Sequence, residues 1–392
     1  MASRVWAAQF CLGQIESSVL NRAVWSLRLV HPSPGRRRNK RRFVVLLAVL
    51  VAGTSVWWLT RPKEIKRPAA RITTRSLSAS AQRAPLASSG LVGVAPAPKQ
   101  PIETNNYPRP PDGIFEVQLA LARLGISPGS LDGVSGPKTR LALMAFQQRE
   151  DLSVTGELDA STKSRLLLAT PPITNYTVTA EDLTRLQPVG KNWLEKSRQN
   201  RLDYETILEL VAEKAQSHPN LIQRLNPAID WTNMVAGTSV IIPSVERPPV
   251  RGKAAFARIH LESRTLQVFD ENTNLLAHFP CSIAAFAEKR PAGELHVAVM
   301  APNPNYTFDP ENFPESAEAR ELNRKLIVPP GPNNPVGTVW IGLDKPGYGI
   351  HGTPRPEQVG RAESHGCFRL ANWNAEYFSQ LAWVGMPVYV EP

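Results

Sequence analysis

The sequence predicts a multidomain protein with a single transmembrane helix, a small all-α three-helix domain, an α+β module and a C-terminal mainly-β domain. Three observations support this fold class. An uncharged apolar run at residues 43–60 follows a cluster of cations, helical periodicity dominates residues 112–248, and alternation with period two dominates residues 252–392. With 392 residues, 42% of them hydrophobic, the chain is long enough for several cores.

The positive charge is unevenly distributed along the chain. The formal net charge is +11, but residues 1–109 hold 18 Lys and Arg against 3 Asp and Glu, whereas residues 110–392 hold 27 against 31. The region expected to fold is therefore slightly acidic. Because nucleic-acid binding requires cations that neutralise phosphates, this composition argues against a nucleic-acid partner.

The apolar run at residues 43–60 predicts one membrane-spanning helix. Its eighteen residues carry no charge, and at about 1.5 Å per residue they span roughly 27 Å, close to the hydrocarbon thickness of a bilayer. Six Lys and Arg precede it within residues 36–42. The positive-inside rule then places residues 1–42 in the cytoplasm as a basic tail and everything after residue 60 in the periplasm or cell-wall space. A signal peptide cleaved near Ala79-Ser80-Ala81 is the alternative.

Residues 61–111 are rich in Pro, Ala, Ser and Arg and show no period, which predicts a disordered linker. The three cysteines, Cys11, Cys281 and Cys367, form no disulfide framework, since the predicted membrane helix separates the first from the others. Cys281 follows an apolar strand pattern and is interpreted as a buried structural thiol. Cys367 is left as a free thiol.

Residues 112–170 carry three stretches with apolar residues on one helical face, separated by Gly-containing turns. Their pattern resembles the peptidoglycan-binding three-helix domain of bacterial wall enzymes; the matching positions are Leu124-Gly125, Asp132-Gly133, Thr139, Phe146-Gln147, Leu152, Gly156 and Thr162. The resemblance implies a domain that binds peptidoglycan. A small structural bundle without a ligand is the alternative.

Residues 171–248 predict a second module, with two short helices followed by a closing strand at Ala236–Pro243. This order, with Arg224–Pro227 and Ala236-Gly237-Thr238, is similar to the LysM glycan-binding fold. The start departs from that family, because some 25 extra residues separate the first strand from the first helix. Glycan binding and a purely structural role therefore both stay open.

The last fifty residues contain the candidate catalytic groups. Cys367 lies within sixteen residues of two histidines, His351 and His365. A thiol is a useful nucleophile when a neighbour takes its proton, and histidine does this near neutral pH. Zinc would also accept these three side chains, but no fourth ligand or paired spacing is evident. We expect no metal and no cofactor.

The C-terminal domain resembles the YkuD-type L,D-transpeptidase catalytic domain over residues 252–392. The resemblance is carried, in order, by Arg290–Gly293, Pro329–Gly337, Tyr348-Gly-Ile-His-Gly-Thr353 and Ser364-His-Gly-Cys-Phe-Arg-Leu370. It implies a mainly-β fold and an acyl-enzyme on cysteine. One departure is Phe368, which stands where a branched aliphatic residue is usual and is expected to pack inward.

Amide exchange through an acyl-enzyme needs a nucleophile, a base and donors for the oxyanion. Cys367 is the predicted nucleophile and His351, at a strand end, the predicted base. The resemblance implies that the Gly352 carbonyl holds the other nitrogen of His351. The backbone N–H groups of Gly366 and Cys367 are the candidate oxyanion donors. His365 is assigned to the pocket wall, with a role as the base left as the alternative.

Four further residues are candidate substrate contacts. Arg369 could hold a substrate carboxylate with two hydrogen bonds, or could pair with Glu363 or Glu376 instead. Ser364 is expected to make structural hydrogen bonds beside the pocket. Tyr348 and Thr353 flank the strand end that carries His351 and could line the pocket, with packing and turn formation as the alternatives.

The predicted function is a membrane-anchored L,D-transpeptidase with peptidoglycan stem peptides as its partners. The resemblance implies a tetrapeptide donor cleaved after its third residue, release of the terminal D-alanine and formation of 3-3 cross-links. Transfer to water would make an L,D-carboxypeptidase, and transfer to a lysine would attach an envelope protein. A non-catalytic wall tether is a further alternative. The sequence does not indicate the oligomeric state.

Overall fold

The computed structural model describes residues 106–250, 252–313, 315–361, 364 and 366–392. The predicted cytoplasmic tail, the predicted membrane helix and residues 61–105 of the predicted linker lie outside these residues, as does His365. In the part that is described, no helix combines the length and the apolar character needed to cross a membrane.

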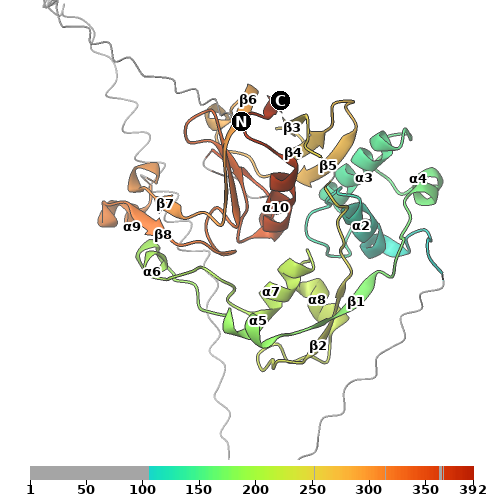
Figure 1. The fold of residues 1–392 in the computed structure, drawn as a ribbon, viewed down its shortest axis with the longest axis horizontal. Helices are drawn as coiled ribbons and strands as arrows, with labels where there is room; N and C mark the ends of the chain where they lie inside the picture. Colours follow the sequence, from blue (N-terminus) through green and yellow to red (C-terminus); the bar gives the residue numbers. More distant parts are fainter. Residues whose placement is uncertain (1–105, 251, 314, 362–363, 365) are drawn as a thin grey trace, which may run out of the picture. The chain divides into compact units, whose positions relative to one another are not determined.

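The first domain contains the three expected helices, α2 (Gly113–Arg123), α3 (Pro137–Arg149) and α4 (Ala160–Arg165) (Figure 1). Their apolar faces form one core that includes Val117, Leu121, Phe146 and Leu166. Helix α4 begins at Ala160 because the Asp159 carboxylate accepts a hydrogen bond from the Thr162 N–H at 2.8 Å.

This domain starts before the predicted boundary at residue 112. Arg109 exchanges backbone hydrogen bonds with Leu168, at 3.1 Å and 2.8 Å. Its guanidinium also makes an ion pair with Glu116 at 2.6 Å. The end of the predicted linker is therefore ordered, because both its backbone and its charge find partners in the helical domain.

The second module joins two antiparallel strands through four helices: β1 (Ile173–Thr177), α5 (Ala180–Thr184), α6 (Trp193–Ser197), α7 (Ile207–Lys214), α8 (Pro219–Leu225) and β2 (Ser239–Pro243). The expected helix, helix and closing strand are α7, α8 and β2. Helices α5 and α6 occupy the extra segment that the sequence places before α7. The strands and the two longer helices share one core, which includes Val178, Leu210, Ile222 and Val240.

The C-terminal domain is built on an eight-stranded sheet with the strand order β11-β10-β9-β6-β12-β3-β4-β5. The strands are β3 (Phe256–His260), β4 (Thr265–Phe269), β5 (Leu275–Pro280), β6 (Gly293–Pro302), β9 (Val339–Leu343), β10 (Gly349–His351), β11 (Phe368–Arg369) and β12 (Pro387–Glu391). This confirms the mainly-β prediction. Helix α10 (Asn372–Leu381) packs on the sheet (Figure 1), with Phe378 and Leu381 in the shared core.

The sheet is curled, because the chain that leaves β5 returns to the edge strand β11. Ser282 and Arg369 exchange backbone hydrogen bonds at 2.9 Å and 3.0 Å. Ser364 and Ala284 form a further bridge. Cys281, just beyond β5, is fully buried as expected, and burial raises the pKa of its thiol.

A small hairpin not expected from the sequence, β7 (Tyr306–Phe308) and β8 (Leu326–Val328), stands beside the main sheet. Helix α9 (Ala317–Leu322) connects its strands, and three short 3-10 turns, η1 (Ala287–Lys289), η2 (Pro310–Asn312) and η3 (Pro356–Gln358), complete the domain. Trp193 of α6 stacks on Phe308 with ring centroids 4.5 Å apart. The second module therefore touches this hairpin.

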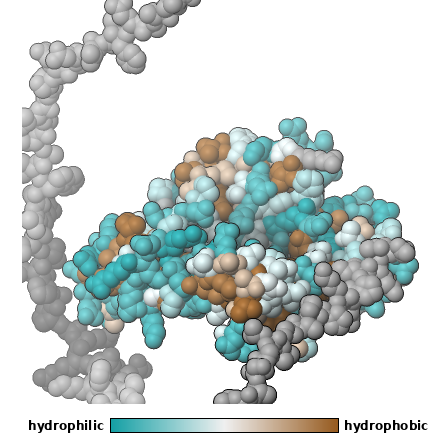
Figure 2. All heavy atoms as spheres, turned by 60° about the horizontal axis from the view of Figure 1, so that its bottom comes forward, coloured by the Kyte–Doolittle hydropathy of each residue, from teal (hydrophilic) through white to brown (hydrophobic). Residues whose placement is uncertain are grey.

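Exposed apolar side chains are spread over the surface rather than gathered in one place. The face in Figure 2 shows small hydrophobic groups separated by hydrophilic ones. The large exposed apolar residues come from all parts of the described chain: Val134, Val154, Leu167, Val235, Phe286, Val299, Ile327, Trp383 and Val384. Scattered residues of this kind are normal for a folded domain and do not by themselves indicate an interface.

Candidate active site

Cys367 lies at the entrance to the edge strand β11, on the short turn that follows Ser364. The Ser364 hydroxyl donates to the Cys367 carbonyl at 2.5 Å and accepts from the Gly366 N–H at 3.3 Å. Ser364 therefore shapes the turn that presents the thiol. The thiol itself is 3.6 Å from the carbonyl oxygen of Gly347.

His351 is the last residue of β10 and is buried, with 4% of its surface exposed. Its Nδ1 lies 2.6 Å from the carbonyl oxygen of Gly352. Since a carbonyl can only accept, Nδ1 carries the hydrogen and Nε2 is left to accept a proton. The Trp340 ring stacks on the imidazole, with centroids 5.6 Å apart and planes inclined by 24°.

The pairing of β10 with β11 brings these two residues to one face of the sheet. The strands are parallel, with Ile350 opposite Phe368 and His351 opposite Arg369. Side chains alternate between faces along a strand, so Cys367, two residues before Arg369, shares the face of His351. Phe368 points the other way and is buried in the core, as expected.

Gly349 lies beside Cys367 and leaves room for the Trp340 ring. Its N–H hydrogen-bonds to the Cys367 sulfur and lowers the thiol pKa. A Cβ on Gly349 would lie 2.6 Å from the Trp340 ring, closer than real side chains approach. Glycine is therefore required for Trp340 to reach His351.

Cys367 and His351 are both held in their neutral forms near pH 7. Burial lowers the pKa of His351 to about 4, although the hydrogen bond to Gly352 acts in the opposite direction. Burial also raises the pKa of Cys367, against the effects of Gly349 and Arg369. The pair is thus a thiol and a neutral imidazole, and an attack by the sulfur would require transfer of its proton.

Two known families match this chain. Residues 255–390 match the L,D-transpeptidase catalytic domain family, YkuD, and residues 110–166 match a family described as a putative peptidoglycan binding domain. The C-terminal domain is an L,D-transpeptidase catalytic domain. The predictions of an L,D-transpeptidase-type enzyme and of a peptidoglycan-binding domain are confirmed at this level.

The curated relatives agree with the family match. The putative L,D-transpeptidase YkuD of Bacillus licheniformis is 27% identical over 191 residues, which is 48% of this chain and 94% of the relative. The probable L,D-transpeptidase YbiS of Escherichia coli is 27% identical over 182 residues, which is 46% of this chain and 58% of the relative. The crystal structure of an L,D-transpeptidase from Xylanimonas cellulosilytica aligns over 73% of this chain and 98% of its own, at 13% identity and a TM-score of 0.31.

Asn372 and Trp340, which the sequence did not single out, support the position of His351 together with Gly337. Gly337, with φ +64°, and Gly352 pack against each other under the side-chain oxygen of Asn372. A Cβ would lie 2.0 Å from that oxygen at Gly337 and 2.2 Å at Gly352. This contact fixes the backbone whose carbonyl holds His351, and Trp340 fixes the ring from the other side. Gly337 did stand in the family pattern, but its contact depends on residues far away in the sequence.

Arg369 and Tyr306 of β7 lie within electrostatic range of Cys367. Burial lowers the pKa of Arg369 and raises that of Tyr306 to about 12, so both stay protonated near pH 7. Glu376, one of the acidic partners considered for Arg369, accepts a hydrogen bond from the Thr338 hydroxyl at 2.6 Å. The other, Glu363, lies outside the described residues.

The remaining predicted residues take different positions. Tyr348 lies beside Gly366, since a Cβ on Gly366 would be 3.8 Å from its ring, so it is placed to line the pocket. Thr353 is buried, and its hydroxyl accepts from the Arg355 N–H at 3.3 Å, as in the turn interpretation. His365 lies outside the described residues. Within the described set, no three His, Cys, Asp or Glu side chains gather in a way that could hold a metal ion.

Proposed function

We propose that the protein is an L,D-transpeptidase that acts on peptidoglycan stem peptides through an acyl-enzyme on Cys367. The observation that carries this proposal is the arrangement of the two reacting groups. Cys367 lies beside Gly349, on the sheet face of His351, and the Gly352 carbonyl orients His351 at 2.6 Å. A thiol, a base and a group that fixes the tautomer of the base are the three parts that acyl transfer requires.

In the first step, the Cys367 sulfur attacks the carbonyl of the third stem residue while His351 Nε2 takes the thiol proton. A tetrahedral oxyanion forms, for which the N–H groups of Gly366 and Cys367 are the candidate donors. Collapse of this intermediate breaks the amide bond to the terminal D-alanine. Its amine leaves with the proton from His351, and a thioester on Cys367 remains.

In the second step, an amine of a neighbouring stem attacks the thioester. His351 accepts the proton of that amine and returns it to the sulfur as the thiol leaves. The product is a 3-3 cross-link. Water as the acceptor would give carboxypeptidase activity, and a lysine side chain would give an envelope protein attached to peptidoglycan. The peptidoglycan-binding domain at residues 110–166 supports a wall substrate.

Arg369 and Tyr306 are proposed to bind the substrate beside the thiol. Arg369 stays charged and lies on the same sheet face as Cys367, so it suits a stem carboxylate. Tyr306 offers a hydroxyl from the hairpin. Tyr348 is proposed to line the pocket, Ser364 to shape the turn, Thr353 to shape the strand end and His365 to complete the pocket wall.

Membrane attachment through residues 43–60 is a further part of the proposal, based on the apolar run and the cations before it. It would place the catalytic domain in the periplasm or cell-wall space, within reach of peptidoglycan. The LysM-like resemblance of residues 171–248 leads to the proposal that this module contacts glycan strands. The chemistry itself needs no metal and no cofactor.

The test is incubation of the purified protein with a defined tetrapeptide stem donor and a stem acceptor, with products identified by mass spectrometry. We expect released D-alanine and a 3-3 dimer, and neither product from Cys367→Ala. Formation of a tripeptide product without any dimer would identify the protein as an L,D-carboxypeptidase. Unchanged dimer formation by folded Cys367→Ala would refute the proposal.

A further inference from the structure

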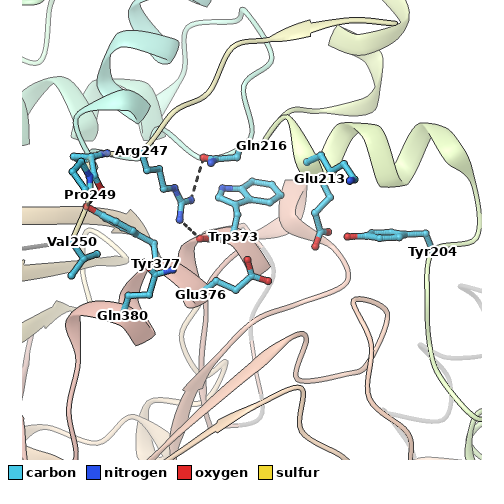
Figure 3. Close-up of a pocket in the computed structure, with 12 residues that line it drawn as sticks. Tyr204, Glu213, Gln216, Arg247, Pro249, Val250, Trp373, Glu376, Tyr377 and Gln380 are labelled. Atoms are coloured by element: carbon cyan, nitrogen blue, oxygen red, sulfur yellow. Dashed lines mark hydrogen bonds between the residues drawn. The ribbon is translucent and has the colours of Figure 1, made fainter. Parts of the chain in front are cut away.

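A cavity of about 460 Å³ lies between the second module and helix α10 of the transpeptidase domain. Tyr204 and Glu213 line it from the module, and Trp373, Glu376 and Tyr377 line it from α10. Figure 3 shows the Glu213 carboxyl at one end of this cavity, facing the hydroxyl of Tyr204. The module therefore places an acidic side chain against helix α10, which begins shortly after the end of β11.

Glu213 is joined to that helix by a hydrogen bond. Asn372, the first residue of α10, donates from its side-chain nitrogen to the Glu213 carboxyl at 2.9 Å and to the Pro332 carbonyl at 3.2 Å. Two acceptors on the nitrogen fix which way the amide faces. The amide oxygen is thereby turned toward the other side, where it accepts from the Thr338 N–H at 3.3 Å.

The oxygen of Asn372 is the atom against which Gly337 and Gly352 pack. With Asn372 fully buried, the two glycine backbones have no space to move toward it. The carbonyl of Gly352 is in turn the acceptor for His351 Nδ1. A continuous set of contacts thus runs from Glu213 through Asn372 and Gly352 to His351.

A second set of contacts holds the loop at residues 329–337 to the same module. Leu202 donates its N–H to the Pro330 carbonyl at 2.8 Å and accepts from the Asn333 N–H at 2.9 Å. The side chain of Asn333 donates to the Glu209 carboxyl at 2.7 Å. Gly331, with φ +141°, allows this approach, because a Cβ there would lie 2.2 Å from the Leu202 oxygen. The loop that ends in Gly337 is therefore fixed from the module.

We propose that Glu213 is a positioning residue for His351, and that the second module thereby holds the catalytic base in its working orientation. Glu213 does not touch the reacting atoms. It acts as the acceptor that orients the Asn372 amide, and this amide fixes the Gly352 carbonyl. The inference rests on the proposed function, because it assumes that His351 is the base.

The test compares three Glu213 variants of the full chain in the stem-peptide assay. Glu213→Ala removes the acceptor, Glu213→Asp withdraws it by one methylene, and Glu213→Gln keeps an oxygen at the same reach. We expect kcat to fall about tenfold in the Ala and Asp variants, while KM stays within about twofold of wild type. The reason is that misplacing a catalytic group by ~1 Å can lower the rate by up to about a hundredfold. Glu213→Gln should restore kcat to within about twofold.

A double-mutant cycle checks that the effect passes through Asn372. If Glu213 acts through that amide, combining Glu213→Ala with Asn372→Ala should lower kcat little further than Asn372→Ala alone. Glu181→Ala, at an exposed glutamate of the same module, is the matched control and should equal wild type. Circular dichroism checks that each variant is folded.

The outcomes separate this inference from the proposed function. An inactive wild-type protein would refute the proposed function. An active wild type with unchanged kcat in Glu213→Ala, or with additive effects in the cycle, would overturn the positioning role. If Glu213→Ala fails to fold, the Asp and Gln variants test the positioning role. Wild-type kcat in Glu213→Asp together with a lowered kcat in Glu213→Gln would overturn it, because the charge at this position would then matter rather than the reach of the acceptor.

Discussion

The two modules that precede the transpeptidase domain contact it in different ways. The peptidoglycan-binding domain meets β5, where the N–H of Ser127 donates to the His278 carbonyl at 2.8 Å and the His278 N–H donates to the Gly125 carbonyl at 3.1 Å. Its Lys138 also reaches the Val359 carbonyl at 3.3 Å, in the loop between His351 and Cys367. None of these contacts involves the Gly352 carbonyl.

The second module instead contacts the residues that support His351. Helix α10 makes the difference clear, because two asparagines near its start serve one module each. Asn372 donates to Glu213 of the second module at 2.9 Å, and Asn374 donates to the Ser127 hydroxyl of the peptidoglycan-binding domain at 3.0 Å. Both asparagines are fully or almost fully buried. A module can therefore be attached at one edge of the domain, or it can support the residues around His351, according to which residues it touches.

The largest expected effect comes from exchanging these two asparagines for alanine, one at a time. Asn372→Ala should lower kcat by up to about a hundredfold, because the backbone at Gly352 loses its support and His351 its orientation. Asn374→Ala should leave kcat near wild type while lowering the free energy of unfolding by about 1 to 3 kcal/mol, since Ser127 and Arg247 lose a buried partner. Steady-state kinetics and denaturant unfolding measure the two effects. Equal losses of kcat in both variants would contradict the comparison.

Acid should lower the stability of both contact regions, because each contains a buried histidine. Burial lowers the pKa values of His278 and His351 to about 4 each. The unfolded chain takes up these protons near pH 6.5 and the folded chain only near pH 4, so stability falls as the pH drops through this window. Each histidine should contribute a loss of about 2 kcal/mol between pH 7 and pH 5.

His278→Gln distinguishes the two histidines. In unfolding experiments, this variant should lose only about half as much free energy of unfolding between pH 7 and pH 5 as the wild type. Its kcat should still fall only near pH 4, where His351 becomes protonated. If kcat of His278→Gln fell at a different pH, the β5 region would also influence the pKa of His351.

A smaller effect is expected from Gly125→Ala at the β5 contact. Gly125 has φ +77°, and a Cβ there would lie 3.1 Å from the Leu276 carbonyl and 3.5 Å from the Tyr377 ring. The strained backbone should lower the free energy of unfolding by about 1 kcal/mol. Activity should not change, because the site lies outside the contacts that hold His351. Thermal unfolding and kcat measured on the same preparation test both statements, and a lower kcat would contradict them.

Much of the fold could be predicted from local sequence patterns. Alternating apolar residues predicted the strands of the C-terminal domain, and helical spacing predicted helices such as α7, because each pattern reports one buried face. The hairpin of β7 and β8 could not be predicted, since its strands of three residues are too short for a period. Its core is completed by Trp193 of another module, which local patterns do not reveal.

The candidate site was predictable to a similar extent. The motifs contain Cys367, His351 and Gly352, which lie close in sequence to the paired strands β10 and β11. Their catalytic roles stay predictions. Asn372, Trp340 and Glu213 were missed. Their contacts join segments as far apart as residues 213 and 372, and only the folded chain brings these together. His365 stays a prediction, because it lies outside the described residues.

The mass of the Cys367-containing peptide, measured after brief incubation with the tetrapeptide donor and no acceptor, shows whether Cys367 carries the acyl group. We expect an adduct on Cys367 whose mass equals that of the donor stem without its terminal D-alanine. We also expect that addition of an acceptor amine removes the adduct. Product formation with Cys367 unmodified throughout, or an adduct carried by Cys281 instead, would contradict the proposed function.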